Sequence, residues 1–133
     1  MEYLVSAEEM RLADRTVIQD YGVPSLVLME RAALSCVELM KKESFDLSRI
    51  LIAAGSGNNG GDGFAMARIL KLQGFSADIW FVGNPEHLSK EAALQKKICE
   101  KYGVKFVRNL PDGEYTTIVT SLFGSGLSRE IRG

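Results

Sequence analysis

The sequence predicts an α/β fold, a Rossmann-like three-layer domain with a mainly parallel sheet. From residue 50 onward, short apolar runs alternate with segments of helical periodicity. This pattern is typical of parallel strands joined by right-handed helical crossovers. The first apolar run leads directly into a glycine-rich segment, residues 55–63. Two further helices are expected before the first strand, and the 133 residues are enough for one domain.

Four strands and two intervening helices account for most of the chain after residue 50. The strands are expected at residues 50–54, 77–82, 104–107 and 115–119, and the helices at 62–73 and 89–102. Gly74 and Gly103 supply the helix stops. We expect strand order 3-2-1-4, with the reversal between strands one and four. Ligands in such sheets bind at that reversal, beyond the carboxyl ends of the strands.

The N-terminal part of the chain predicts two helices. A capping box at residues 6–9 opens the first, and Gly22 ends it. Pro24 and Ser25 open the second. Its apolar stripe consists of Met29, Ala32, Ala33, Cys36, Val37 and Met40. Such a stripe usually packs on the core, and a homodimer interface is the alternative for part of it.

Composition limits the classes of function. The net charge of −1 gives no reason to expect nucleic acid or an anionic membrane as a partner. No apolar run approaches the ~20 residues that cross a bilayer. Cys36 and Cys99 form no C-x-x-C pair, which favours a reducing, cytoplasmic setting. A single histidine, His87, makes a catalytic triad or a histidine metal cluster hard to build.

The glycine-rich segment fits no common nucleotide motif completely. Residues 55–60 match G-x-G-x-x-G, but an ordinary dinucleotide fold also needs an acidic residue where the second strand ends. Asp78 stands at the start of that strand instead. A P-loop fails because Phe64, and not lysine, follows Gly63. The amides of Asn58 and Asn59 can orient a sugar hydroxyl or ligate a hard cation.

Asp62 has two interpretations from the sequence alone. It lies in or beside the first turn of the expected helix, where a carboxylate can simply cap the helix. The alternative is a functional carboxylate that faces a ligand in the glycine-rich segment.

The run Asn58-Asn59-Gly60-Gly61-Asp62-Gly63 resembles the signature loop of the NAD(P)H-hydrate epimerases. Residues 8–14 and 22–30 are similar to the N-terminal helices of that family, and residues 122–127 to its second substrate loop. The resemblance implies interconversion of the R and S forms of hydrated NADH or NADPH. A dehydratase, fused or separate, would then repair the S form.

The resemblance also implies site residues. The substrate-binding residues would be Asn58, Asn59, Gly60, Gly61, Asp62, Gly124, Ser125, Gly126, Leu127, Ser128, Arg129 and Glu130. Asn59 and Thr120 would hold a potassium ion. Thr120 stands where the family usually has aspartate, and a hydroxyl is no acid near neutral pH. Asp62 is therefore the other candidate for the catalytic acid.

The family domain normally continues past the point where this chain ends, and its Asp-Ile-Pro-Ser-Gly type segment does not occur here. We therefore expect residues 1–133 to form one incomplete domain. Its fourth strand would be uncovered, so the chain alone would be unstable or would pair with another copy.

Two alternatives to the epimerase remain open from the sequence. One is a catalytically inactive nucleotide-binding, dimerisation or scaffold module, which Thr120 favours. The other is an ordinary NAD-dependent oxidoreductase, against which the missing acidic residue after Val82 argues.

Overall fold

The computed structural model describes residues 22–108, 114–121 and 130–131. The helices are α2 (Ser25–Lys42), α3 (Asn58–Leu72), α4 (Lys90–Lys101) and the short 3-10 helix η1 (Pro85–His87). The strands are β1 (Ile50–Ala54), β2 (Ala77–Phe81), β3 (Lys105–Val107), β4 (Thr117–Ser121) and β5 (Glu130–Ile131). The second of the two expected N-terminal helices is confirmed as α2. The first lies outside the described residues.

The sheet has the order β3-β2-β1-β4-β5, so the predicted order 3-2-1-4 and the Rossmann-like class are confirmed. The first four strands pair in parallel. The antiparallel strand β5 was not predicted, because two residues carry no detectable alternation. It pairs with β4 at Ile118 and Val119, so the expectation that β4 is uncovered is wrong at these two positions.

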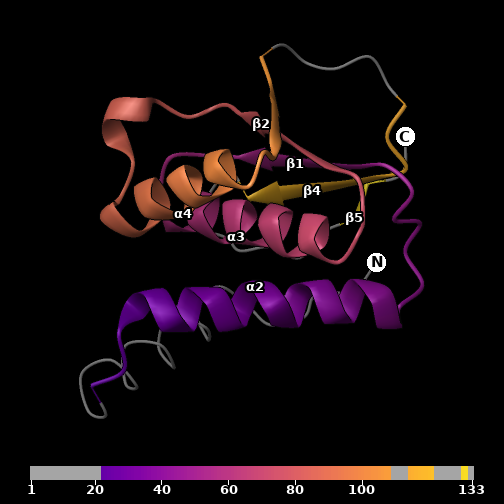
Figure 1. The fold of residues 1–133 in the computed structure, drawn as a ribbon, viewed down its shortest axis with the longest axis horizontal. Coiled ribbons are helices and arrows are strands. Elements are labelled where there is room, and N and C mark those ends of the chain that lie inside the picture. The colour runs from indigo at the N-terminus through magenta and orange to yellow at the C-terminus, as the bar shows by residue number, and fades with distance from the viewer. Residues whose placement is uncertain (1–21, 109–113, 122–129, 132–133) are drawn as a thin grey trace.

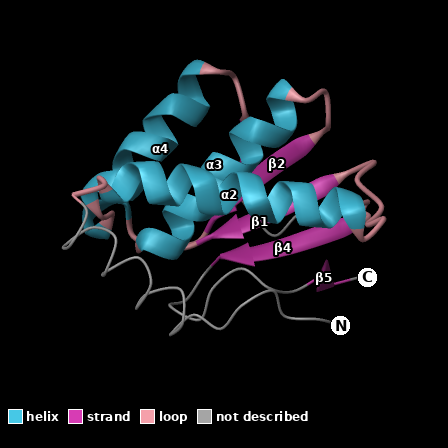
Figure 2. Cartoon of the chain, turned by 90° about the horizontal axis from the view of Figure 1, so that it is seen from below, coloured by secondary structure: helices cyan, strands magenta, loops and turns pink. Residues whose placement is uncertain are grey.

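The described helices α2, α3 and α4 lie on one face of the sheet (Figure 1). Seen from that side, they stand in front of the strands, with α2 towards β4 (Figure 2). The core beneath them joins alternate strand residues such as Ile50, Ile52 and Ile79 to helix residues such as Val37 and Phe64. Leu51 and Ala53 alternate to the other face and are also buried, at 2% and 3% exposure. The strand β1 is therefore buried on both faces, which is common for the central strand of a parallel sheet.

The helix α3 begins at Asn58, four residues before the predicted start at residue 62. Glycine inside a helix is unfavourable by about 1 kcal/mol relative to alanine, so the sequence favours a start after the glycines. Close packing explains why glycine, and no larger residue, stands at these helical positions. A Cβ on Gly60 would lie 1.8 Å from the carbonyl oxygen of Gly55. A Cβ on Gly61 would lie 2.8 Å from the Met29 side chain of α2 and 3.2 Å from Cα of Ala92 of α4.

The strand β4 begins at Thr117, two residues after the predicted start, and extends through Ser121. The two residues before it make side-chain contacts. Tyr115 Oη donates to Asp78 Oδ2 at 2.8 Å, and Thr116 Oγ1 donates to the carbonyl oxygen of Asp46 at 2.8 Å. These bonds hold the entrance of β4 against the amino ends of β1 and β2.

Asp78 lies at the amino end of β2, as the sequence predicted, far from the ligand edge of the sheet. It is buried and pairs with Arg49, with Nη2 to Oδ2 at 3.6 Å. Burial and the bond to Asp78 raise the pKa of Tyr115. The carboxylate therefore has a structural role, and it is not available to hold a ribose.

Candidate functional site

The candidate site lies where α2, α3 and α4 begin. All of them start at the end of the molecule towards which β1 and β4 point (Figure 1). The sheet reverses its order between these two strands, because β2 and β3 lie on one side of β1 and β4 on the other. A crevice for a ligand is expected at this edge. The turn after β1, residues 55–57, lies here as predicted.

The start of α3 has no side-chain cap. Its N-cap is Gly57, in an extended conformation, and its first turn contains no acidic residue. The N–H of Gly61 donates to the Gly57 carbonyl oxygen at 3.3 Å. The three amides before it, of Asn58, Asn59 and Gly60, have no acceptor within the helix by helix geometry. A helix start of this kind favours an anionic group.

Two of the predicted substrate residues, Gly60 and Gly61, also pack closely within the protein. Gly60 and Gly61 are required as glycines by contacts within the protein, since their Cβ directions meet Gly55, Met29 and Ala92. Any contact that they make with a substrate would therefore come from the backbone. The side chains of Asn58 and Asn59 lie outside what the structure describes, so their roles stay predictions.

Asp62 is the fifth residue of α3, so the cap interpretation is wrong. Its side chain is partly exposed. Burial, and in second place the charge of Asp62, raise the pKa of Cys36 on α2 to about 11. The carboxylate therefore lies on the side of α3 that faces α2.

Thr120 lies near the carboxyl end of β4, in register with Ala53 of β1. Its neighbour Val119 belongs to the core beneath the helices. Strand alternation therefore directs Thr120 to the opposite face of the sheet. The hydroxyl is partly exposed and would meet a ligand in the crevice from the side opposite to α3.

The end of β2 does not offer the ribose site of an ordinary dehydrogenase. Gly83 and Asn84 follow the strand where a carboxylate would be needed. The side chain of Asn84 instead accepts a hydrogen bond from the Glu86 amide at 2.9 Å and caps η1. This arrangement supports the sequence argument against an NAD-dependent oxidoreductase.

The turn at residues 55–57 is held by contacts that sequence reasoning missed. The Ser89 amide donates to the Ser56 carbonyl oxygen at 3.2 Å, and the Val82 amide donates to that of Ala54 at 2.9 Å. A Cβ on Gly83 would lie only 2.5 Å from the Ser56 nitrogen. The sequence offered one indication of these contacts, which is that Gly83 directly follows the strand predicted at residues 77–82.

The cysteines and the histidine offer no alternative chemistry. Burial is the main cause that raises the pKa of Cys99 to about 12 and of Cys36 to about 11, so neither is a thiolate near neutral pH. Cys99 Sγ donates to the Phe64 carbonyl oxygen at 2.9 Å. His87 is exposed on η1. The described part of the chain contains no group of three or more His, Cys, Asp or Glu residues that could hold a metal ion.

Most of the second predicted substrate loop lies outside the described residues. This applies to Gly124, Ser125, Gly126, Leu127, Ser128 and Arg129. Glu130 is described only as part of β5, opposite Val119. Their contacts with a substrate therefore stay predictions.

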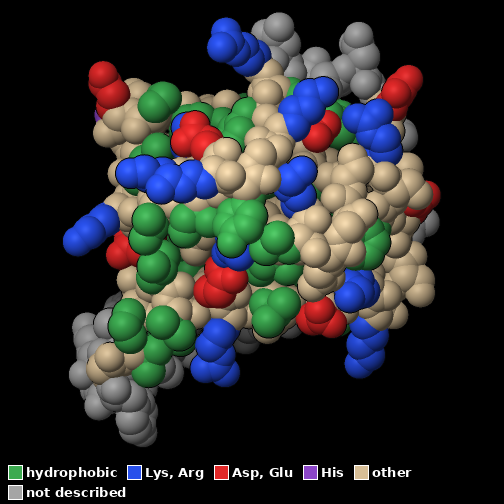
Figure 3. All heavy atoms as spheres, in the orientation of Figure 1, with side chains coloured by type: hydrophobic (Ala, Val, Ile, Leu, Met, Phe, Trp, Pro, Cys, Tyr) green, Lys and Arg blue, Asp and Glu red, His purple; other side chains and the backbone are tan. Residues whose placement is uncertain are grey.

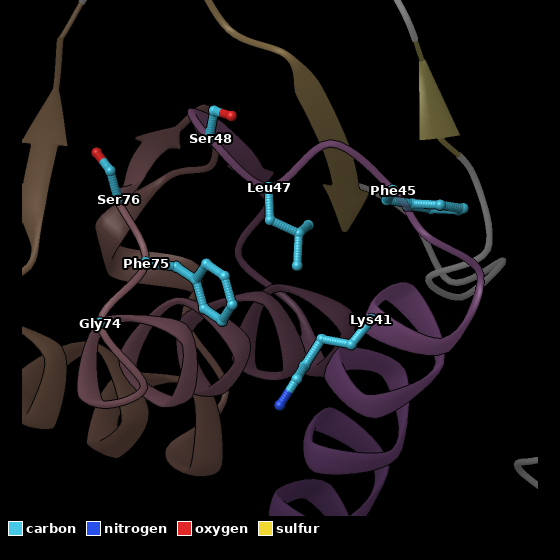
Figure 4. Close-up of a pocket in the computed structure, with 7 residues that line it drawn as sticks. All are labelled: Lys41, Phe45, Leu47, Ser48, Gly74, Phe75 and Ser76. Atoms are coloured by element: carbon cyan, nitrogen blue, oxygen red, sulfur yellow. The ribbon is translucent and has the colours of Figure 1, made fainter.

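A hollow in the described surface lies at the other end of the sheet (Figure 4). Its lining consists of Lys41, Phe45, Leu47, Ser48, Gly74, Phe75 and Ser76. These residues flank the carboxyl ends of α2 and α3 and the amino ends of β1 and β2, so the hollow is separate from the candidate site. Among the described helices, none has the length and apolar character that a membrane span requires.

Comparisons with known proteins agree with the fold and the motif. A family model described as YjeF-related protein N-terminus matches residues 25–133. A protein of Oenococcus oeni named NAD(P)H-hydrate epimerase is 47% identical over 131 residues, covering 97% of this chain and 62% of its own. A protein of the same name from Weissella koreensis is 48% identical over 128 residues, covering 96% of this chain and 58% of its own. The chain thus spans about 60% of the length of these curated relatives.

The similarity extends to a solved structure. The crystal structure of the yeast protein ynu0 superposes with a TM-score of 0.70 and covers 92% of this chain and 57% of that chain. The sequences are 20% identical, so this match supports the fold.

Proposed function

Because the chain belongs to the family of YjeF-related protein N-termini, we propose that it is the nucleotide-binding part of an NAD(P)H-hydrate epimerase. The reaction would interconvert the R and S epimers of hydrated NADH and NADPH. The observation that carries this proposal is the start of α3, which is glycine-rich and has no side-chain cap, at the reversal of the sheet. The two relatives named NAD(P)H-hydrate epimerase point to the same substrate.

The start of α3 would bind an anionic part of the substrate. The amides of Asn58, Asn59 and Gly60 would donate to phosphate oxygens, favoured by the helix dipole. The asparagine side chains would orient sugar or amide groups of the substrate. The second loop, residues 124–130, would contact the substrate from the carboxyl end of β4.

The chemistry requires a proton donor. The epimeric carbon carries a hydroxyl next to the ring nitrogen. When that hydroxyl is protonated, water leaves, and the nitrogen lone pair forms a C=N bond to the carbon. Water then adds to the other face of the ring and loses a proton. A positioned carboxylic acid is the natural catalyst for the first step.

We assign the acid to Asp62 in this chain. It is the carboxylate within the segment that resembles the family's signature loop, and its charge acts on Cys36 of α2. Thr120 occupies the position of the family's aspartate, but its hydroxyl does not donate a proton near neutral pH. Turnover should therefore be slower than in a protein that has aspartate at this position.

A potassium ion fits the donors at this edge. Asn59 and Thr120 would offer neutral oxygens, and potassium is held by such oxygens in proteins. Thr120 is partly exposed at the carboxyl end of β4, where a ligand could reach it. A bound ion would supply positive charge beside the substrate's phosphates.

An inactive binding or scaffold module is the second candidate function, and the observation that favours it is Thr120 in place of an acid. Apolar side chains on the surface are compatible with a homodimer. Hydrophobic groups lie over α4 and the beginning of α2 (Figure 3). Val27 of α2 and Leu94 of α4 are exposed apolar side chains. With the epimerase, we also propose a fused or separate dehydratase as partner and a cytoplasmic location.

Chromatographic separation of the two epimers of hydrated NADH over time tests the function. The assay compares the chain with a version lengthened by the C-terminal segment of the Oenococcus oeni relative. We expect epimer exchange above the spontaneous rate in the lengthened version. Binding of hydrated NADH without exchange would support the scaffold module, and hydride transfer with intact NADH would support the oxidoreductase.

A further inference from the structure

We propose that Gly83 and Ser89, in the connection between β2 and α4, are positioning residues that hold the substrate turn at residues 55–57. The proposal rests on the proposed function, because the turn acquires its role from the substrate. Neither residue belongs to the segments that resemble the family's substrate loops. Both reach the site through the backbone of Ser56.

Gly83 packs directly against the turn. A Cβ at this position would lie 2.5 Å from the Ser56 nitrogen, 2.8 Å from the Ser56 Cβ and 3.0 Å from the Gly55 carbonyl carbon. Real Cβ atoms do not approach backbone atoms this closely, so a larger residue at position 83 must move the turn and the connection apart. The backbone of Gly83 is not in the left-handed region, unlike that of Gly74 and Gly103. Space, and not conformation, therefore requires glycine here.

Ser89 fixes the same turn by a hydrogen bond. Its amide donates to the Ser56 carbonyl oxygen at 3.2 Å. This bond joins the segment before α4 to the segment before α3. On the other side of the turn, Gly60 packs against the Gly55 carbonyl oxygen. The turn is thus held between the first turn of α3 and the connection from β2 to α4.

This arrangement matters because the turn leads directly into the amides that would bind phosphate. A displacement of about 1 Å in a binding group can reduce activity by up to 10²-fold. Binding to phosphate is remote from the reacting carbon, so it should affect the ground state and the transition state alike. Loss of such uniform binding raises KM and leaves kcat nearly unchanged.

The first test is Gly83→Ala in the lengthened version of the chain. We expect KM for hydrated NADH to rise about tenfold, with a smaller change in kcat. We also expect faster hydrogen exchange at the Ser89 amide, measured by NMR, because the displaced turn loses its bond. An unchanged KM together with unchanged exchange at Ser89 would overturn the proposal.

Asn84→Ala is the matched control in the same connection. It removes the cap of η1 but does not touch the turn. KM should therefore stay at the parent value. A rise equal to that of Gly83→Ala would mean that general loosening of the connection, and not the turn, sets KM.

A second pair of variants isolates the hydrogen bond. Ser89 has φ −63° and the preceding Leu88 has φ −63° and ψ 133°, so proline fits the backbone at position 89. Ser89→Pro removes both the amide donor and the side-chain cap of α4, whereas Ser89→Ala removes only the cap. We expect KM to rise in Ser89→Pro alone. Equal KM values in the pair would contradict a role for the amide.

The experiment separates this proposal from the proposed function. If the lengthened parent shows no epimer exchange, the proposed function fails. Exchange at the Ser89 amide in Gly83→Ala then still decides whether Gly83 holds the turn. If the parent is active and KM is the same in all variants, the positioning role alone is overturned.

Discussion

The helices α3 and α4 follow neighbouring strands of the same sheet, yet they begin in opposite ways. Ser89 caps α4 by accepting the Ala92 amide at 3.1 Å, and Glu91 places negative charge in the first turn. Gly57 provides no such side chain for α3, and its first turn contains no acid. At the third helical position α4 has Ala92 and α3 has Gly60.

The difference distinguishes a structural helix start from one that is available to a ligand. The side chain of Ser89 accepts a hydrogen bond from a free amide at the start of α4, and Glu91 complements the helix dipole, so this end does not require a ligand. The start of α3 has no side-chain cap, and its glycines lower the helix propensity. Departures from local rules are expected at functional sites, and this one lies at the reversal of the sheet.

Gly60→Ala should produce the largest effect on stability. Helix propensity alone predicts stabilisation by about 1 kcal/mol. The 1.8 Å approach of the new Cβ to the Gly55 oxygen predicts the opposite, a loss of about 3 kcal/mol in the free energy of unfolding. Urea unfolding measures the difference. Gly57→Ala, whose Cβ would meet no protein atom within 4 Å, should change stability by less than about 1 kcal/mol.

Thr120→Asp tests the other side of the crevice. In the lengthened version, a carboxylic acid at this position should raise the rate of epimer exchange by about two orders of magnitude, the typical contribution of a positioned acid. This corresponds to about 2.7 kcal/mol of transition-state stabilisation. Dependence on potassium should also increase, because a carboxylate binds a hard cation better than a hydroxyl does.

The assay for this prediction is epimer exchange with and without potassium. Asp62→Asn provides the complementary measurement. Equal rates for the parent and Thr120→Asp, with activity lost in Asp62→Asn, would mean that Asp62 alone supplies the acid.

Gly57→Asp would give α3 the kind of cap that α4 already has. The carboxylate should accept from a first-turn amide and stabilise the protein by about 0.3 kcal/mol, a small gain because glycine is itself tolerated at the N-cap. It should also raise KM for hydrated NADH about tenfold, since it occupies amides and repels phosphate. Denaturation and steady-state kinetics measure the two effects, and Gly57→Ala separates charge from bulk. A gain in stability with an unchanged KM would count against phosphate binding at α3.

Ser89→Ala should give the smallest effect on substrate binding. It removes the cap of α4 and should lower the free energy of unfolding by about 1 kcal/mol. KM should not change, because the Ser89 amide is retained. A large increase in KM would mean that the start of α4, like that of α3, takes part in binding.

Several features could be predicted from the sequence because they depend on local patterns. The uninterrupted apolar run at residues 50–54 predicted a strand, and the bounds of β1 are the predicted ones. The crossovers required the order 3-2-1-4. The motif with Asn58 and Asp62 predicted both the family and the edge of the sheet where the candidate site lies.

The tertiary structure decided what local rules could not. The requirement for glycine at the start of α3 depends on tertiary contacts. Gly60 packs against Gly55 of the preceding turn, and Gly61 packs against Met29 and Ala92, which are distant in sequence. The support of the turn by Gly83 and Ser89 depends on two crossover units that meet in space. Propensity and periodicity describe a residue and its near neighbours along the chain. Steric contact between backbones arises only when separate elements pack, so the sequence determined where a site forms and the packing determined how its backbone is held.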